Sequence, residues 1–289
     1  MKEITVLSGK GGAGKTSVTA ALASLFCNAV FCDNDVDASD LHLIFSPQKS
    51  QVNEFIHGWN MLVDPLICDG CGICENLCRF DAISVNIFGK AEVNNIKCEG
   101  CRLCERSCPS NALMPTPNRE NCWYLSSTRF GPFISAEMGV AEDNSGKLVS
   151  YIRNKAEIYA KESNADYIIN DGPPGIGCPT IASITGTDVV LVVIEPTVSG
   201  WHDALRVLDL VRKWGIKVYA VINKGGLNIS LQDEISVKLL EIGVPLLSII
   251  PWSKDFVEAM KLGQNVMEYS HDTMLKRSIE IIYQELKLE

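Results

Sequence analysis

The residues with the clearest chemical potential lie near the start of the chain, in the run Gly9–Thr16. Their spacing fits the phosphate-loop pattern G-x-x-x-x-G-K-[ST]. In such a loop, glycines let backbone N–H groups surround anionic oxygens, Lys15 reaches the terminal phosphates and the Thr16 hydroxyl binds Mg²⁺. An accidental glycine-rich turn is the alternative, and it would not need a strand before the loop and a helix after it. The predicted nucleotide-binding residues are Gly11, Gly12, Ala13, Gly14, Lys15, Thr16 and Ser17.

Cysteine is the second residue type that could do chemistry, and eight of the twelve cysteines fall in two runs of identical spacing, thirty residues apart. Around the cysteines, Gly70 matches Gly100 and Glu75 matches Glu105. Structural zinc is the alternative to a metal cluster, but zinc sites use separated pairs that close one tetrahedron. The two runs are Cys68-x₂-Cys71-x₂-Cys74-x₃-Cys78 and Cys98-x₂-Cys101-x₂-Cys104-x₃-Cys108. The sequence therefore predicts two metal sites in a repeated module.

Carboxylates follow two apolar runs, at the points where strands are expected to end. Four aspartates come after residues 29–32, and Asp171 comes after residues 167–170. In parallel sheets, the carboxyl ends of the strands border the crevice where ligands bind. An apolar strand that ends in aspartate beside a phosphate loop holds the Mg²⁺ shell, which we expect of Asp171. A carboxylate that only caps a turn is the alternative for each.

The elements that must position these residues alternate along the chain. We expect a strand at residues 4–7, a helix at 16–26 and a further strand at 133–136. Apolar strands at 189–194, 217–223 and 246–250 alternate with helices at 200–214 and 230–242, and two helices follow the last strand. Strands that are apolar throughout and alternate with helices form a parallel sheet covered on both faces, so we predict an α/β fold.

The cysteine runs interrupt this alternation. Residues 47–67 show little periodicity except for a short strand at 61–63, and Pro115 and Pro117 look like a return linker. We therefore expect an α/β domain formed by residues 1–60 and 118–289, with an inserted module at residues 61–117. A module of about 50 residues has too small a core to be robust, so bound metal should stabilise it.

Composition narrows the functional classes. The chain has 289 residues, 46% of them apolar and 21% charged, which is ordinary for a globular protein. The formal charge of −9, without a lysine or arginine block, argues against nucleic acid or an anionic membrane as partner. There is no stretch of about 18 apolar residues and no signal peptide at the start. We expect a cytoplasmic protein without disulfides.

Lys10, one residue after the first glycine of the phosphate loop, gives the loop a resemblance to the deviant Walker loop of the MinD, ParA, Mrp and nitrogenase iron-protein ATPases. The segment Asp171–Gly175 (DGPPG) is similar to the MinD and Mrp group. The resemblance implies an ATP-dependent homodimer in which Lys10 acts on the partner subunit's nucleotide. Asp33 would then hold a Mg²⁺-bound water, and Asp35, with Asp40 as its rival, would orient the attacking water. Two further residues, Asn223 and Pro251, would flank adenine.

Residues 66–115 resemble the two-cluster bacterial ferredoxins, with Arg79 as a departure where that family has proline. In that family, each [4Fe-4S] cluster takes three cysteines of one run and the last cysteine of the other. The resemblance implies that Cys68, Cys71, Cys74 and Cys108 hold one cluster, and that Cys98, Cys101, Cys104 and Cys78 hold the other.

Two features outside these motifs stay open. Cys178 lies seven residues after Asp171, the spacing at which the nitrogenase iron protein places a ligand of its subunit-bridging cluster. An apolar residue at a helix start is the alternative for Cys178. Residues 272–288 have nearly balanced charges and no basic face, so we expect a packed or surface helix rather than a membrane anchor.

Three functions compete at this level. The leading hypothesis is an ATPase whose turnover gates electron transfer through two [4Fe-4S] clusters to a redox partner. The second is a scaffold or carrier in iron–sulfur or metallocofactor assembly, with a metallocofactor protein or a paralogous ATPase as partner. The third is a spatial-organising ATPase of the MinD/ParA kind with a redox-sensing insert. All three rest on analogy of fold.

Overall fold

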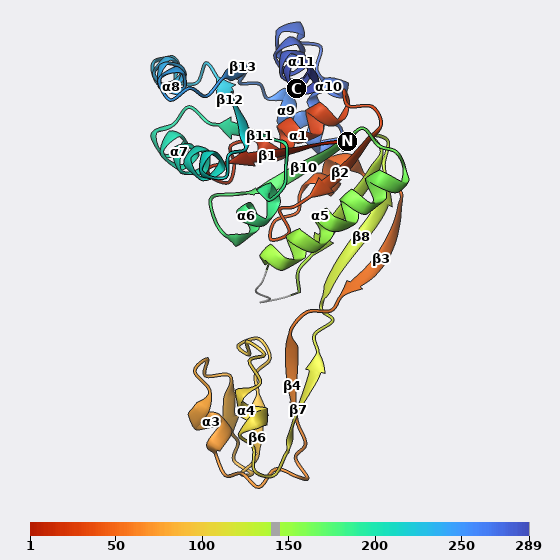
Figure 1. Cartoon of the computed structure of the whole chain (residues 1–289), viewed down its shortest axis with the longest axis vertical. Helices are drawn as coiled ribbons and strands as arrows, with labels where there is room; N and C mark the ends of the chain where they lie inside the picture. Colours follow the sequence, from red (N-terminus) through yellow and green to blue (C-terminus); the bar gives the residue numbers. More distant parts are fainter. Residues whose placement is uncertain (140–144, 289) are drawn as a thin grey trace. The chain divides into compact units, whose positions relative to one another are not determined.

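The computed structural model describes residues 1–139 and 145–288, which form two compact units (Figure 1). The first unit contains residues 1–52, 124–136 and 145–288. The second contains residues 53–123 and 137–139, so it extends beyond 61–117 at both ends. Among the described residues, no helix is both long and apolar enough to cross a membrane.

A nine-stranded sheet forms the centre of the fold, in the order β13-β12-β11-β1-β10-β2-β9-β8-β3. The pairings from β13 through to β9 are parallel. The strands are β1 (Lys2–Ser8), β2 (Ala29–Asp33), β3 (Lys49–Phe55), β8 (Asn121–Ser127), β9 (Pro132–Glu137), β10 (Tyr167–Pro174), β11 (Val189–Ile194), β12 (Lys217–Gly225) and β13 (Leu246–Pro251). The predicted α/β class with a mostly parallel sheet is confirmed.

Helices cover both faces of this sheet, and β11 shows why its strands are apolar throughout. Val189, Leu191 and Val193 pack in one core cluster, while Val190, Val192 and Ile194 pack in the other. Successive side chains of a strand point to opposite faces, so both faces must be apolar. The first cluster also contains residues of α1 (Lys15–Ala23) and α11 (Thr273–Leu288), and the second contains residues of α7 (Val198–Lys213) and α8 (Ile229–Glu241).

The first unit contains further helices, which are α2 (Leu41–Phe45), α5 (Ser145–Glu162), α6 (Cys178–Ile184), α9 (Asp255–Lys261) and α10 (Val266–Tyr269). Of these, α5 and α6 pack against each other and against β10. The prediction of two helices after the last strand is wrong, because three follow it. Asn265 begins α10 with a capping box in which it is paired with Glu268, and this local signal separates α10 from α9.

The strands β3 and β8 of this sheet were not predicted. Within residues 47–67 one short strand is expected at 61–63, and it corresponds to β4 (Trp59–Val63), but β3 also lies in this part of the chain. β3 has the sequence KSQVNEF and lies at the edge of the sheet, next to β8. An edge strand with polar residues lacks the apolar run that marks buried strands, so the sequence pattern could not identify it.

The second unit is built from two small hairpin-like sheets and two short helices. β4 pairs antiparallel with β7 (Leu113–Pro117), and β5 (Ile83–Val85) pairs antiparallel with β6 (Ala91–Val93). The helices are α3 (Ile73–Leu77) and α4 (Leu103–Arg106). Pro115 and Pro117, expected in a linker, belong to β7. The core combines apolar side chains such as Met61 and Leu113 with the cysteines.

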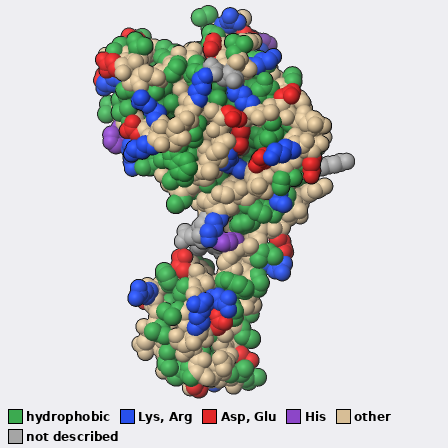
Figure 2. All heavy atoms as spheres, in the orientation of Figure 1, with side chains coloured by type: hydrophobic (Ala, Val, Ile, Leu, Met, Phe, Trp, Pro, Cys, Tyr) green, Lys and Arg blue, Asp and Glu red, His purple; other side chains and the backbone are tan. Residues whose placement is uncertain are grey.

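Charged side chains of both signs are interspersed on the face of the molecule that Figure 2 shows. This distribution agrees with the absence of a lysine or arginine block in the sequence.

Candidate functional site

The loop between β1 and α1 has the backbone that the glycine pattern requires. Gly14 caps α1 with a φ of 91°, in the left-handed region. A Cβ at Gly14 would lie 2.1 Å from Nδ2 of Asn223, so glycine is also required for space. Asn223 donates from Nδ2 to the carbonyl oxygen of Ala13 at 2.8 Å, and Lys224 Nζ donates to that of Gly12 at 2.8 Å. The end of β12 therefore holds the loop in place.

Lys15 and Thr16 meet the carboxylate of Asp171, which lies within the adjacent strand β10, three residues before its last residue. Lys15 Nζ lies 2.9 Å from Asp171 Oδ2, and Thr16 Oγ1 donates to the same oxygen at 2.7 Å. Thr19 Oγ1 donates to Oδ1 of Asp171 at 2.8 Å. Burial opposes the charge of Lys15, but Asp171, Asp35 and Asp33 together raise the pKa of Lys15 above its ordinary value. The sequence motifs of β1 and β10 thus converge on one cluster.

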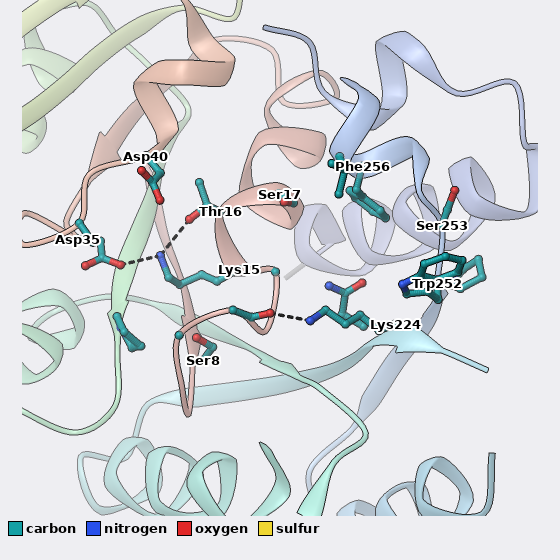
Figure 3. A pocket seen from close by; sticks show the side chains of 18 residues that line it. Ser8, Lys15, Thr16, Ser17, Asp35, Asp40, Lys224, Trp252, Ser253 and Phe256 are labelled. Carbon is teal, nitrogen blue, oxygen red and sulfur yellow. Dashed lines mark hydrogen bonds and ion pairs between the residues drawn. The ribbon is translucent and has the colours of Figure 1, made fainter. Parts of the chain in front are cut away.

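The aspartates that follow β2 occupy different positions. Asp33 lies opposite Asp171 in the register of β2 and β10 and is fully buried. Burial, with the nearby Asp171 carboxylate, raises the pKa of Asp33 to about 7. Asp35 Oδ2 lies 3.4 Å from Lys15 Nζ (Figure 3). Asp40 is exposed at the start of α2 and lines the pocket. Of the two rivals for orienting water, Asp35 is the one in contact with Lys15.

A pocket of about 470 Å³ extends from the phosphate loop toward β13. The predicted residues Asn223 and Pro251 line it, together with Trp252, Lys224 and Phe256, which the sequence analysis did not identify (Figure 3). The pocket therefore has one polar end, formed by the loop, and another end lined by the aromatic side chains of Trp252 and Phe256. Lys224 and Trp252 could have been predicted from their positions in the sequence, because each directly follows a predicted site residue at the end of an expected strand.

Lys10 is bound within its own chain. Its Nζ lies 2.8 Å from Oε2 of Glu195 and donates to the hydroxyls of Thr197 and Ser199, both at 3.2 Å. Glu195 Oε1 lies 2.8 Å from Nζ of Lys224. Partial burial opposes ionisation of Glu195, but the two lysines outweigh it and lower the pKa of this carboxyl. Glu195 therefore binds both Lys10 and Lys224, and Lys224 supports the loop. The sequence pattern did not identify Glu195.

In the second unit, the two cysteine runs cross over. One hollow is lined by Cys68, Cys71, Cys74 and Cys108, and another is lined by Cys78, Cys98, Cys101 and Cys104. Within residues 1–139 and 145–288, no group of three or more His, Cys, Asp or Glu side chains converges tightly enough to hold a single metal ion. All twelve cysteines are free thiols.

Burial affects the thiols differently. It raises the pKa of Cys74 and Cys98, and it raises the pKa of Cys104 to about 11. For Cys108, burial acts in the same direction, but hydrogen bonds from Ser110 and the following backbone lower the pKa below the ordinary value. Metal binding to these thiols would release protons.

Cys178 is the first residue of α6 and is exposed. Its backbone and side chain lie close to Gly146 of α5, where an added Cβ would be 3.2 Å away. This contact packs α6 against α5.

Comparison with known proteins places the chain in a family. The family model described as "CobQ/CobB/MinD/ParA nucleotide binding domain" matches residues 4–266. An uncharacterized protein of Methanocaldococcus jannaschii is 33% identical over 290 residues, covering 99% of this chain and 96% of that protein. The septum site-determining protein MinD of Neisseria meningitidis is 25% identical over 287 residues, covering 92% and 84%.

Solved structures show the same fold. MinD in the MinC:MinD cell division protein complex of Aquifex aeolicus superposes with a TM-score of 0.59 at 19% identity, covering 100% of this chain and 97% of that one. MinD of Pyrococcus horikoshii, complexed with Mg-ADP, superposes with a TM-score of 0.58 at 18% identity, covering 99% and 95%. The phosphate loop, Asp171 of β10 and the family match agree, and the chain belongs to the CobQ/CobB/MinD/ParA family of nucleotide-binding domains.

Proposed function

We propose that this protein is an ATP-hydrolysing homodimeric switch of the MinD/ParA kind. The observation that carries the proposal is the carboxylate of Asp171, which Lys15 and Thr16 share within 2.9 Å. The oxygen donors of Thr16, Asp171 and Asp33 form the hard ligand set that Mg²⁺ prefers, so these residues would hold the ion or its waters. Bound Mg²⁺ would neutralise charge on the phosphates.

The chain's own residues supply the rest of the chemistry. Lys15 places a buried cation at the terminal phosphates, where positive charge stabilises the transition state of phosphoryl transfer. Asp35, 3.4 Å from Lys15, would accept a hydrogen bond from the attacking water. The amide of Asn223 and the ammonium of Lys224 fix the loop backbone, so its N–H groups stay directed at the phosphates.

In this proposal, Lys10 acts across the dimer. The Lys10 side chain is 29% exposed and is held by Glu195. On ATP binding, Lys10 would exchange this partner for the nucleotide of a second subunit. Lys10 would then be bound to Glu195 in the monomer and to the nucleotide of the second subunit in the dimer.

The test is steady-state ATP hydrolysis by the purified full chain, with the oligomeric state measured by analytical ultracentrifugation. We expect ATP and Mg²⁺ to promote dimers, and Asp35→Ala to accumulate dimers without turnover. Asp209→Ala, on the exposed surface of α7, is the matched control and should behave as the wild type. A chain that neither binds nor hydrolyses ATP would overturn the proposal.

A second proposed function is the binding of two [4Fe-4S] clusters by the inserted module. Each hollow is lined by four cysteines, three from one run and the last from the other, the combination found in two-cluster ferredoxins. When bound, each cluster would carry one electron. The chain's residues hold the thiols in place, and backbone N–H groups of Ala82, Ala91 and Ala112 point at cysteine sulfurs at 3.4–3.5 Å.

Joining the two functions gives either ATP-gated electron transfer to a redox partner or the carriage of clusters to a metallocofactor protein. The kinship with MinD favours a spatial-organising role for the ATPase unit, with the cysteine module as a sensor. Anaerobic purification with iron and sulfide quantification separates these proposals. Clusters that resist chelation support redox or sensing roles, clusters that leave support carriage, and filaments or gradients on lipid or DNA support spatial organisation.

A further inference from the structure

The two cysteine hollows share one backbone framework around their fourth thiol. Cys78 and Cys108 occupy the same place in the thirty-residue repeat. Four residues after each of them, the N–H of Ala82 or Ala112 lies 3.4 Å from the cysteine sulfur. The residue before that alanine has a positive φ in both copies, 49° and 54°. The backbone around the fourth thiol therefore does not distinguish the two hollows.

The side chain two residues after the fourth cysteine differs. Ser110 places its hydroxyl oxygen 3.5 Å from the sulfur of Cys108, in the first hollow. The matching residue is Phe80, which lines the second hollow and follows Cys78. A hydroxyl can donate a hydrogen bond to a thiolate, whereas a phenyl ring cannot.

A second difference lies on the strands. The N–H of Ala91 in β6 lies 3.5 Å from the sulfur of Cys68, in the first hollow. Its equivalent, thirty residues earlier, is Met61, whose N–H donates instead to Oδ1 of Asn95 at 3.4 Å. Once again the first hollow gains a donor directed at sulfur.

Among the charged groups near the hollows, Lys90 also places positive charge beside the first hollow. Asp69 in the first hollow and Glu99 in the second are equivalent by the repeat, so they do not distinguish the two. Lys90 Nζ donates to the carbonyl oxygen of Cys68 at 2.5 Å. Arg102 lines the second hollow, but both of its contacts with the Glu105 carboxylate are within 2.9 Å, which balances its charge.

We propose that the two sites are electronically inequivalent, and that the site of Cys68, Cys71, Cys74 and Cys108 has the higher reduction potential because Ser110 stabilises its thiolate charge. Reduction adds a negative charge, and hydrogen bonds to sulfur stabilise it. The first electron to enter the module would reside there. This inference rests on the proposed binding of two clusters.

The test is a redox titration of the anaerobically purified full chain with dithionite as reductant, followed by electron paramagnetic resonance, after iron and sulfide have been counted. We expect two midpoints in the wild type. Ser110→Ala should shift the higher midpoint down by a three- to tenfold change in the reduction equilibrium, about 30–59 mV for one electron, and leave the lower one in place. Ser110→Thr, which keeps the hydroxyl, should retain the wild-type value.

The reciprocal variant keeps the test open if Ser110→Ala fails to load iron. Phe80→Ser should raise the lower midpoint by a similar amount and spare the higher one. Ser84→Ala, an exposed serine of β5, is the matched control and should shift neither. Iron-loaded protein in which neither variant shifts a midpoint, or in which Ser110→Ala shifts the lower one, would overturn the inference alone. Wild-type protein without iron would overturn the proposed module and this inference with it.

Discussion

Nζ of Lys10 lies 2.8 Å from Oε2 of Glu195 in the same chain, although the family resemblance gives this lysine a role in the partner subunit. The two roles exclude each other, because one ammonium cannot serve both places. Glu195 also pairs with Lys224, which supports the phosphate loop. In the proposed dimer, the carboxylate would therefore compete with the nucleotide of the second subunit for Lys10.

Glu195→Gln should strengthen ATP-dependent dimerisation. Partly exposed ion pairs contribute about 0.2–1 kcal/mol, so we expect the dimer dissociation constant to fall by up to about fivefold. Sedimentation across a range of protein concentrations measures it. Glu234→Gln, which removes the surface partner of Lys238, should leave it unchanged. A weaker dimer in Glu195→Gln would show that Glu195 does not compete for Lys10.

Lys10→Ala should lower the ATP turnover number by a factor of about 100 or more, because it removes a charge that stabilises the transition state. The dissociation constant for ATP should change much less, since the loop and Lys15 remain. Turnover and equilibrium nucleotide binding, measured on the same preparation, separate the two effects. Full activity in a monomeric Lys10→Ala protein would contradict the role across the dimer.

Asn223→Ala should weaken ATP and GTP binding to the same degree. Nδ2 of Asn223 donates a hydrogen bond to the carbonyl oxygen of Ala13, so the variant loses a buried hydrogen bond that holds the loop. A buried bond of this kind is worth about 1 kcal/mol, which predicts a loss of about fivefold. Calorimetry with both nucleotides tests this. A loss confined to ATP would support the sequence-based expectation that Asn223 flanks adenine.

The stability of the first unit should depend on pH through Glu268. Partial burial opposes its charge, but hydrogen bonds from Arg129 and the backbone of Asn265 lower the pKa of this carboxyl. A folded-state pKa below the unfolded value gives stability that is present above about pH 4.5 and lost as the pH falls through the folded value. Glu268→Gln should therefore unfold more easily than the wild type at pH 7, by about 1 kcal/mol.

The difference between the two proteins should shrink as the pH falls below 4.5 and through the folded-state pKa, as measured by urea unfolding in the absence of nucleotide. Glu258→Gln, which removes the exposed partner of Lys261, should follow the wild type at every pH. A constant difference between wild type and Glu268→Gln would mean that the lost side chain acts through packing alone.

The cysteine assignment predicts how iron is lost. Cys74→Ser and Cys104→Ser remove a ligand from different hollows, so each should retain about half of the wild-type iron, and the double variant should retain almost none. Iron quantification after anaerobic purification measures this. Cys27→Ser, outside both runs, should keep the full amount. Equal loss in both single variants beyond half would indicate a single shared site.

The sequence by itself determined the chemistry that depends on short spacing. The phosphate loop at Gly9–Thr16, the aspartates that follow the apolar runs 29–32 and 167–170, and the two cysteine runs are local patterns, because their residues are neighbours in the sequence. Apolar strands such as β11 are also predicted by a local pattern, since burial on both faces requires an unbroken apolar run. The α/β class followed from them.

Only the tertiary structure decided which partners those residues have. Glu195 meets Lys10 and Lys224 across the ends of β11 and β12, and Trp252 reaches the pocket from β13, contacts between segments far apart in the chain. The strand β3 could be identified only from its pairing with β8 at the edge of the sheet. The difference between Ser110 and Phe80 matters because Ser110 contacts Cys108 and Phe80 lines the other hollow. Sequence spacing fixes which residues are close along the chain, whereas hydrogen bonds and charges act between residues that packing brings together.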